Sequence, residues 1–243
     1  MKERFYYDLH THSCLSPCAD NDNTPNNLAG MASLLGIDIL ALTDHNCLKN
    51  CPAFFKACER YGVVPIAGAE LTTAEDIHVV CLFPNLDVAM EFDSFLEEHR
   101  NRIKNRPEIF GNQYITDEND EITGECDTLL SFATDITIDA VKNTVEKFNG
   151  IAYPAHIDRE SNGIISTLGT IPEHLDFKVI EIKDSDKISH YSEKYNLSDK
   201  KIVICSDAHN LEGIRDKENY FELDAERGNS NDIINKLFEY LRS

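Results

Sequence analysis

Short runs of apolar residues alternate with amphipathic segments over most of this 243-residue chain. The runs predict buried strands, and the amphipathic segments predict helices. The predicted strands cover residues 5–9, 37–43, 63–70, 77–83, 150–156, 179–183 and 201–206. The predicted helices cover residues 25–35, 52–61, 87–104, 137–148, 188–195 and 232–241. Repeated strand and helix units of this kind favour an α/β fold with a parallel sheet, either a barrel or an open doubly wound sheet.

The regular alternation stops between about residues 106 and 135. This segment contains QYITDENDEITGE, a polar stretch that predicts a hairpin inserted into the framework. Such an insertion usually lies over a site as a cap. The sequence has no internal repeat and no linker, so we expect residues 1–243 to form a single domain.

The chain is strongly acidic, with 23 Lys and Arg residues against 43 Asp and Glu residues and a formal charge of -20. This charge repels long polyanions, so we expect no stable binding of duplex nucleic acid. A small phosphorylated substrate or a short oligonucleotide remains compatible, because bound divalent metals reverse the potential inside a pocket. The sequence shows no apolar run long enough for a membrane span and no signal peptide, which favours a cytoplasmic protein without membrane contact.

Eight cysteines are present, and without a secretion signal we expect them to be reduced. Three lie in apolar runs and are expected to be buried packing residues, namely Cys58, Cys81 and Cys205. Four form two Cys-x3-Cys pairs in loops, Cys14 with Cys18 and Cys47 with Cys51. A four-thiolate metal site or a redox pair is one interpretation of these pairs, although the spacing is not that of a zinc ribbon.

Side chains that bind metals fall at the ends of the predicted strands. They are His10, His12, Asp44, His45, Glu70, His156, Asp207 and His209. In parallel α/β architectures the carboxyl ends of the strands form the active-site face, so these residues are expected to meet. His78 is an exception, because it lies near the start of its predicted strand. The remaining histidines lie in polar segments and are expected to be solvated, namely His99, His174 and His190.

Imidazole and carboxylate ligands together suit zinc, manganese or iron. In a His-x-His at a strand end both imidazoles point to the same side, because residues i and i+2 of a strand point alike. A single histidine at a strand end is more often a structural residue than a ligand, but six of the nine histidines lie in these segments. The sequence shows neither a Gly-rich phosphate loop nor a Ser nucleophile elbow, so metals would have to activate the nucleophile.

The ordered motifs resemble those of the PHP family, which is named for DNA polymerases and histidinol phosphatase, over about residues 6 to 210. The motifs are His10-Thr11-His12, Thr43-Asp44-His45, Gly68-Ala69-Glu70, His78, Pro154-Ala155-His156 and Ser206-Asp207-Ala208-His209. The resemblance implies a distorted (βα)7 TIM-like barrel that holds two or three divalent metal ions at the carboxyl ends of its strands. It also implies the ligands: His10, His12, Glu70 and Asp207 for the first ion, Glu70, His78 and His156 for the second, and His45 and His209 for the third.

The family's remaining ligand to the third ion is commonly a histidine, and its position in this sequence is occupied by Cys18. A thiolate is a competent zinc ligand, so the resemblance favours Cys18 as that ligand. Two alternatives stay open, namely that Asp20 takes its place or that the third site is weak. Asp44 is expected to orient or support neighbouring groups and not to donate a proton.

Residues 156–159 resemble the family's A-H-P-x-R segment, with isoleucine where proline is usual. Arg159 is therefore the candidate for a phosphate clamp, because a guanidinium binds phosphate oxygens bidentately, and the alternative is an ordinary loop arginine. The favoured hypothesis is an enzyme in which a metal-bound hydroxide attacks phosphorus. The resemblance implies a 3′,5′-nucleotide bisphosphate phosphatase or a 5′-3′ exonuclease acting on a nucleotide or a short oligonucleotide. The alternatives are a phosphatase of a small metabolite such as histidinol phosphate, a non-catalytic metal-stabilised regulatory domain, and an amide or lactone hydrolase.

Overall fold

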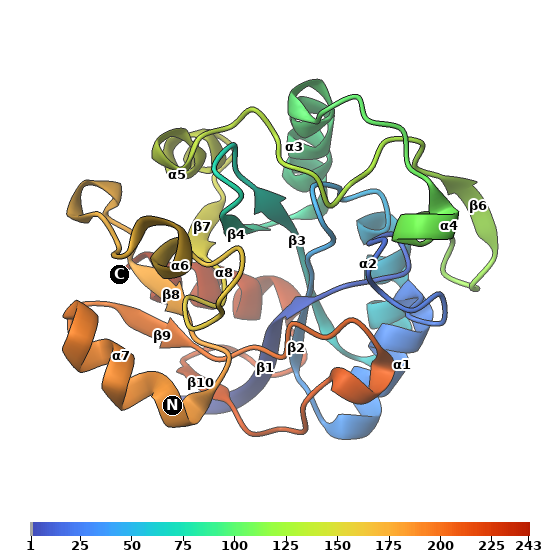
Figure 1. Cartoon of the computed structure of the whole chain (residues 1–243). Coiled ribbons are helices and arrows are strands. Elements are labelled where there is room, and N and C mark those ends of the chain that lie inside the picture. Colours follow the sequence, from blue (N-terminus) through green and yellow to red (C-terminus); the bar gives the residue numbers. More distant parts are fainter. Residues whose placement is uncertain (1) are drawn as a thin grey trace.

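The computed structural model describes residues 2–243 and confirms a mixed α/β fold built on a curled six-stranded sheet (Figure 1). The strand order in this sheet is β10-β1-β2-β3-β4-β7. Its strands are β1 (Glu3–Thr11), β2 (Ile39–Leu42), β3 (Val64–Thr72), β4 (His78–Phe83), β7 (Ile151–Pro154) and β10 (Tyr220–Leu223). β1, β2 and β3 are parallel, while β4 is antiparallel to β3, β7 to β4, and β10 to β1.

The expectation of a parallel sheet is therefore wrong at β4 and at β10. A parallel strand needs a crossover connection of about a dozen residues or more. Only residues 73–77 separate β3 from β4, so the chain turns back and the two strands form an antiparallel pair.

Two smaller sheets complete the β-structure. β5 (Tyr114–Thr116) and β6 (Ile122–Glu125) form an antiparallel hairpin, and β8 (Val179–Glu181) and β9 (Lys201–Val203) form a parallel pair. Beyond β9, Ala208 forms an isolated parallel bridge with Thr11 of β1. Within residues 2–243 no ladder joins β7 to β8, so the closed (βα)7 barrel stays a prediction.

The helices are α1 (Pro25–Leu35), α2 (Cys51–Tyr61), α3 (Leu86–His99), α4 (Pro107–Phe110), α5 (Ile138–Lys147), α6 (Ile164–Leu168), α7 (Ile188–Tyr195) and α8 (Ser230–Arg242), with short 3₁₀ turns η1 (Glu173–Leu175), η2 (Ser185–Lys187) and η3 (Leu211–Gly213). α1 begins as the sequence predicts, because the Thr24 side chain accepts a hydrogen bond from the backbone N–H of Asn27. It ends at Gly36, whose φ of 72° is in the left-handed region that favours glycine. None of the helices in residues 2–243 has the length and apolar character needed to cross a bilayer.

The helix predicted over residues 87–104 is shorter in the structure, because α3 ends at His99. Arg100 already has extended backbone, with φ -66° and ψ 146°. Its guanidinium is turned inward, where Nη2 lies 3.4 Å from Asp93 Oδ1 with both side chains buried. The chain leaves the helix at Arg100, whose backbone N–H still donates to the carbonyl of Leu96.

The two faces of the sheet bury two different cores. In β2, Leu40 and Leu42 face the core shared with α1, α2, α3 and α5. Ile39 and Ala41 face the opposite core, which α8 covers. This alternation follows from the two-residue period of a strand, and it holds the strand ends rigidly at one edge.

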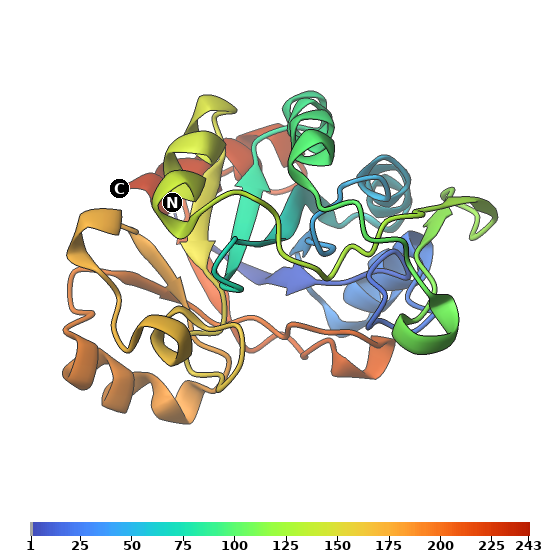
Figure 2. The same ribbon diagram turned by 45° about the horizontal axis from the view of Figure 1, so that its top comes forward.

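The segment predicted to be an insertion, about residues 106–135, lies against the loops at that edge (Figure 2). The backbone N–H of Tyr114 donates to the carbonyl of Cys14 at 2.9 Å. The side-chain amide of Asn46 donates to the carbonyls of Leu130 at 2.7 Å and Phe132 at 3.0 Å. The insertion is thereby attached to the loops that follow β1 and β2.

Candidate metal centre

The direction of β4 explains the unusual position of His78. Because β4 runs antiparallel to β3, His78 at its start pairs with Thr72 at the end of β3. β7 runs antiparallel to β4 in turn, so Val79 pairs with Pro154 and His156 follows at the same edge. One edge of the sheet therefore collects the carboxyl ends of β1, β2, β3 and β7 together with the start of β4.

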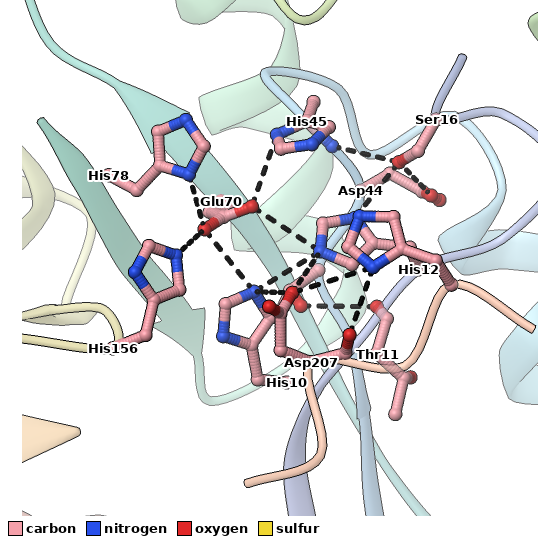
Figure 3. Close-up of polar contacts among 12 residues, drawn as sticks. His10, Thr11, His12, Ser16, Asp44, His45, Glu70, His78, His156 and Asp207 are labelled. Atoms are coloured by element: carbon pink, nitrogen blue, oxygen red, sulfur yellow. Dashed lines mark hydrogen bonds and ion pairs between the residues drawn. The ribbon is translucent and has the colours of Figure 1, made fainter. Parts of the chain in front are cut away.

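Glu70 lies at the centre of this edge and is 1% exposed (Figure 3). Five imidazoles surround its carboxylate. The distances to the nearest Glu70 oxygen are 3.4 Å from His10 Nε2, 3.3 Å from His12 Nε2, 3.1 Å from His45 Nδ1, 2.7 Å from His78 Nδ1 and 2.9 Å from His156 Nε2. Oε1 faces His10, His78 and His156, whereas Oε2 faces His12 and His45. The two oxygens of one carboxylate thus face two different groups of nitrogens.

Asp207 lies beside His10, His12 and Glu70, and the ligand atoms of these four side chains are spaced like those of a metal site. His10 Nε2 and His12 Nε2 are 3.2 Å apart, and they lie 3.6 and 3.4 Å from Asp207 Oδ1. With the contacts of 3.4 and 3.3 Å to Glu70, five separations fall between 3.2 and 3.6 Å. A tetrahedral ion with ligands at about 2.1 Å has ligand-to-ligand edges of about 3.4 Å. The donor set and its spacing therefore fit a divalent cation.

Unpaired buried atoms support the same conclusion. His45 Nδ1, Glu70 Oε2 and Asp207 Oδ1 have no hydrogen-bond partner although all three are buried. Burying a polar atom without a partner costs about 1–3 kcal/mol. Three such atoms converging on one spot fit an ion that would satisfy them.

The imidazoles and carboxylates shift one another's pKa values strongly. Burial alone would raise the pKa of Glu70, but the neighbouring imidazoles, His78 first, hold it well below its usual range. Burial lowers the pKa of His12, yet the carboxylates of Asp207 and Glu70, which lie 3.4 and 3.3 Å from its Nε2, outweigh this and raise it to about 9. Burial lowers the pKa of His209 to about 4. The protein thus keeps ionised carboxylates beside imidazoles of different basicity.

A buried carboxylate orients the first histidine of the cluster. Both oxygens of Glu181, in β8, lie 3.0 Å from His10 Nδ1. Glu181 Oε1 also accepts a hydrogen bond from the backbone N–H of His156 at 3.0 Å. Glu181 is fully buried, so its charge fixes the ring of His10 and leaves Nε2 facing Glu70. Sequence reasoning missed this residue, because it lies in the apolar run VIEIK with no motif around it.

Asp44 supports the second histidine indirectly. Its carboxylate accepts hydrogen bonds from the Ser13 hydroxyl at 2.6 Å and the Ser16 hydroxyl at 2.7 Å. The Ser16 hydroxyl oxygen also lies 3.0 Å from His12 Nδ1. Asp44 belongs to none of the ligand groups in residues 2–243, in line with the supporting role expected for it.

The backbone around two cluster residues is unusual. His156 has a φ of 28° and Asp207 a φ of 51°, both in the region that non-glycine residues rarely adopt. The backbone N–H of Asp207 donates to the carbonyl of His10 at 3.0 Å, which ties the segment after β9 to β1. Strained residues of this kind cluster at functional sites.

Three groups of side chains have mutually close ligand atoms. They are His10, His12, Glu70 and Asp207; His45, Glu70 and His78; and His12, His45 and His209. The first group is the set that the resemblance implies for the first ion. The other two differ in part, because His78 lies with His45 and not with His156, and His12 joins His45 and His209. Which residues ligate which ion therefore stays a prediction.

Cys18 and Asp20 belong to none of the three groups, and Cys18 is exposed as a whole residue. Crowding around its thiol and the carboxylates of Glu70 and Asp207 nevertheless raise the pKa of Cys18 to about 12. The thiol thus lies within electrostatic reach of the cluster. Ligation by Cys18 stays a prediction.

The Cys-x3-Cys pairs are not joined, since all eight cysteines are free thiols. Cys47 packs with Cys126 of the insertion in a small apolar cluster, and not with Cys51. The packing residues are buried as expected, namely Cys58, Cys81 and Cys205. His190 is exposed as expected, while His99 and His174 lie on the surface in pairs with Asp135 and Asp139.

Comparison with known families gives a match to the PHP domain over residues 8–142. An error-prone DNA polymerase from Symbiobacterium thermophilum is 36% identical over 77 residues, which are 32% of this chain and 7% of the polymerase. A 5′-3′ exoribonuclease from Haemophilus influenzae is 30% identical over 102 residues, which are 39% of this chain and 36% of that protein. The chain therefore corresponds to only part of the length of these relatives.

Solved structures share the fold at low sequence identity. A complex of Endonuclease Q with a 27-mer duplex substrate that has an abasic lesion at the active site has a TM-score of 0.67 and 17% identity, covering 99% of this chain and 57% of that one. A protein from Bifidobacterium adolescentis, described as a candidate metal-dependent phosphoesterase, has a TM-score of 0.59 and 15% identity, covering 98% of this chain and 97% of that one. At these identities the likeness shows the fold alone.

The expectation of no stable duplex nucleic-acid binding was wrong, and the Endonuclease Q complex overturns it, since a protein of this fold holds a duplex at its active site. The error lay in treating a charge of -20, summed over the whole chain, as the potential at one site. The electrostatic potential at the metal centre depends on the nearest charges and on any bound cation, because salt screens interactions beyond about 10 Å.

Proposed function

The chain belongs to the PHP domain family, and from that premise we propose that it is a metal-dependent phosphoesterase acting on phosphate esters of nucleotides or oligonucleotides. The observation that carries the proposal is the group formed by His10, His12, Glu70 and Asp207, whose imidazole and carboxylate atoms lie 3.2–3.6 Å apart with unpaired buried atoms among them. Divalent ions in such a cluster lower the pKa of a coordinated water toward neutrality and neutralise charge on phosphate oxygens.

The residues of this chain divide the work between holding ions and orienting their ligands. His10, His12 and Asp207 would hold one ion with Glu70. Glu70 is the candidate for a bridge between ions, because its two oxygens face different groups of imidazoles. The further ligands that we propose are His45, His78, His156, His209 and Cys18.

Arg159 is proposed as the phosphate clamp. Its Nη1 lies 2.8 Å from Asp207 Oδ2, and its side chain is 42% exposed, so the guanidinium is both beside the cluster and reachable from solvent. A guanidinium in this place can turn two N–H groups toward phosphate oxygens. Its proposed role is binding and charge neutralisation, since a guanidinium stays protonated and cannot act as a base.

The substrate class follows from the relatives. The exoribonuclease and the polymerases similar to this chain act on nucleic acid by their names, and Endonuclease Q cuts DNA in the related fold. We therefore place nucleic-acid phosphate esters first, duplex substrates included. A phosphorylated metabolite is the competing substrate class.

The test is phosphoester hydrolysis by the purified chain after metal removal and reloading with Mn²⁺ or Zn²⁺. The panel contains nucleoside mono- and bisphosphates, a single-stranded oligonucleotide, a duplex with an abasic site, and an amino-alcohol phosphate. We expect metal-dependent cleavage of nucleotide or nucleic-acid substrates. Cleavage of the amino-alcohol phosphate alone would move the substrate class to metabolites, and absence of hydrolysis across the panel with metal bound would refute the enzyme.

A further inference from the structure

Two cations share one oxygen of Asp207. Arg159 Nη1 lies 2.8 Å and Lys183 Nζ 3.1 Å from Asp207 Oδ2. The other oxygen of the same carboxylate, Oδ1, faces His10 and His12 and has no hydrogen-bond partner. The Asp207 carboxylate thus lies between the imidazole cluster and a pair of partly exposed cations.

The backbone around Lys183 is firmly held. Its N–H donates to Asp158 Oδ1 at 2.9 Å, and its carbonyl accepts from Arg215 Nη2 at 2.6 Å. The N–H of Asp184 donates to the second oxygen of Asp158 at 3.1 Å, and Asp158 is only 7% exposed. The segment after β8 is therefore fixed, while the Lys183 side chain is 37% exposed and can meet a ligand.

Asp207 Oδ2 contacts two cations at once. One carboxylate oxygen carries less than a full negative charge, and it faces two full positive charges. Basic residues are few in this chain, 23 against 43 acidic residues. Two of them lie beside the cluster with exposed side chains, where they can bind a further anion. A phosphate group has several oxygens and can take a bidentate contact from arginine and a point charge from lysine at once.

We propose that Lys183 is a phosphate-binding residue that forms a two-cation clamp with Arg159 for the phosphate group of a nucleic-acid substrate. This inference rests on the proposed function for its substrate class. The clamp binds the phosphate by displacing both cations from Asp207 Oδ2, so that the affinity depends on each cation separately.

The test measures equilibrium binding without turnover. A fluorescein-labelled single-stranded oligonucleotide with a 5′-phosphate and a hydrolysis-resistant phosphorothioate backbone is titrated with Zn²⁺-loaded protein at several salt concentrations, and fluorescence anisotropy is followed. For Lys183→Met we expect about tenfold weaker binding and a salt slope smaller by about 0.7, the value for one cation released from a single strand. Lys183→Arg should keep most of the affinity, because it keeps the charge.

Lys178→Met is the matched control. Lys178 precedes β8 as Lys183 follows it, and its ammonium pairs with Asp176 on the surface. This variant should bind like the wild type. Thermal unfolding of each variant checks the fold, and Lys183→Gln serves as a second neutral variant if Lys183→Met unfolds early.

Three results decide the proposal. Loss of affinity and slope in Lys183→Met, with Lys178→Met unchanged, supports the clamp. Equal affinity and slope in the wild type and both neutral variants of Lys183 would overturn it. It is also overturned if the zinc content of Lys183→Met falls together with its oligonucleotide binding, because Lys183 would then act only by positioning Asp207. None of these measurements needs hydrolysis, so a failure of the proposed activity is recognised separately.

Discussion

Replacing Glu181 by glutamine changes one charge in the centre of the protein and almost nothing of its shape. The side chain is fully buried, and its two oxygens contact His10 Nδ1 at 3.0 Å each. Glutamine keeps an oxygen for the backbone N–H of His156, which now donates to Glu181 Oε1 at 3.0 Å. It removes the negative charge that makes the ring of His10 a stronger ligand.

The size of the effect follows from these contacts. Removing a carboxylate that orients a ligating histidine typically lowers metal affinity about 10–100-fold, which is about 1.4–2.7 kcal/mol. The stability of the metal-free protein should fall by less, about 0.5–1.5 kcal/mol, because one buried contact to His10 weakens while the contact to His156 is kept. Metal affinity should therefore fall even where the fold is intact.

The assay is competition for Zn²⁺ between the protein and a chromogenic chelator, with urea unfolding in EDTA run in parallel. Glu222→Gln is the control, since Glu222 lies on the surface 3.4 Å from Arg4 and far from the cluster in the β10 strand. Wild-type zinc affinity in Glu181→Gln, with the control also unchanged, would refute the assignment of Glu181 as the residue that orients His10.

Three further predictions follow from the cluster and the insertion. Glu70→Gln and Asp207→Asn should each lower phosphoester hydrolysis by about a thousandfold while circular dichroism stays that of the wild type, and wild-type rates in either variant would contradict the ligand assignment. Removal of metal with EDTA should lower the Tm by about 5–10 °C and Zn²⁺ should restore it, because an ion at a hundred times its Kd adds about 2.7 kcal/mol, and calorimetry showing no shift would speak against a resident ion. The thiol of Cys47 donates to Cys126, and Arg100 Nη1 lies 3.7 Å from the Cys126 sulfur, which together hold the pKa of Cys126 below its usual range. Arg100→Met should therefore shift the pH midpoint of Cys126 alkylation upward in peptide mass spectrometry; an unshifted midpoint would show that Arg100 does not lower this pKa.

Local sequence pattern was sufficient for most strands and helices and for the residue types that gather at the site, although it did not predict β10 of the main sheet. Apolar runs bounded by polar residues predicted the strands, and the capping residues Thr24 and Gly36 predicted the limits of α1. The same runs placed His10, His12 and Glu70 at strand ends, because a strand that is buried on both faces becomes polar only where it leaves the sheet. Such patterns indicate whether each residue is buried or exposed in its own strand or helix.

The direction of each strand and the partners of each side chain depended on tertiary structure. His78 joins the cluster only because the short connection after β3 forces β4 to turn back, which no period of apolar residues encodes. Glu181 and Lys183 flank the last residue of one apolar run, and their contacts with His10 and Asp207 join positions 171 and 24 residues apart. Such contacts arise from which apolar faces are buried against each other, and that is a property of the whole chain and not of any segment.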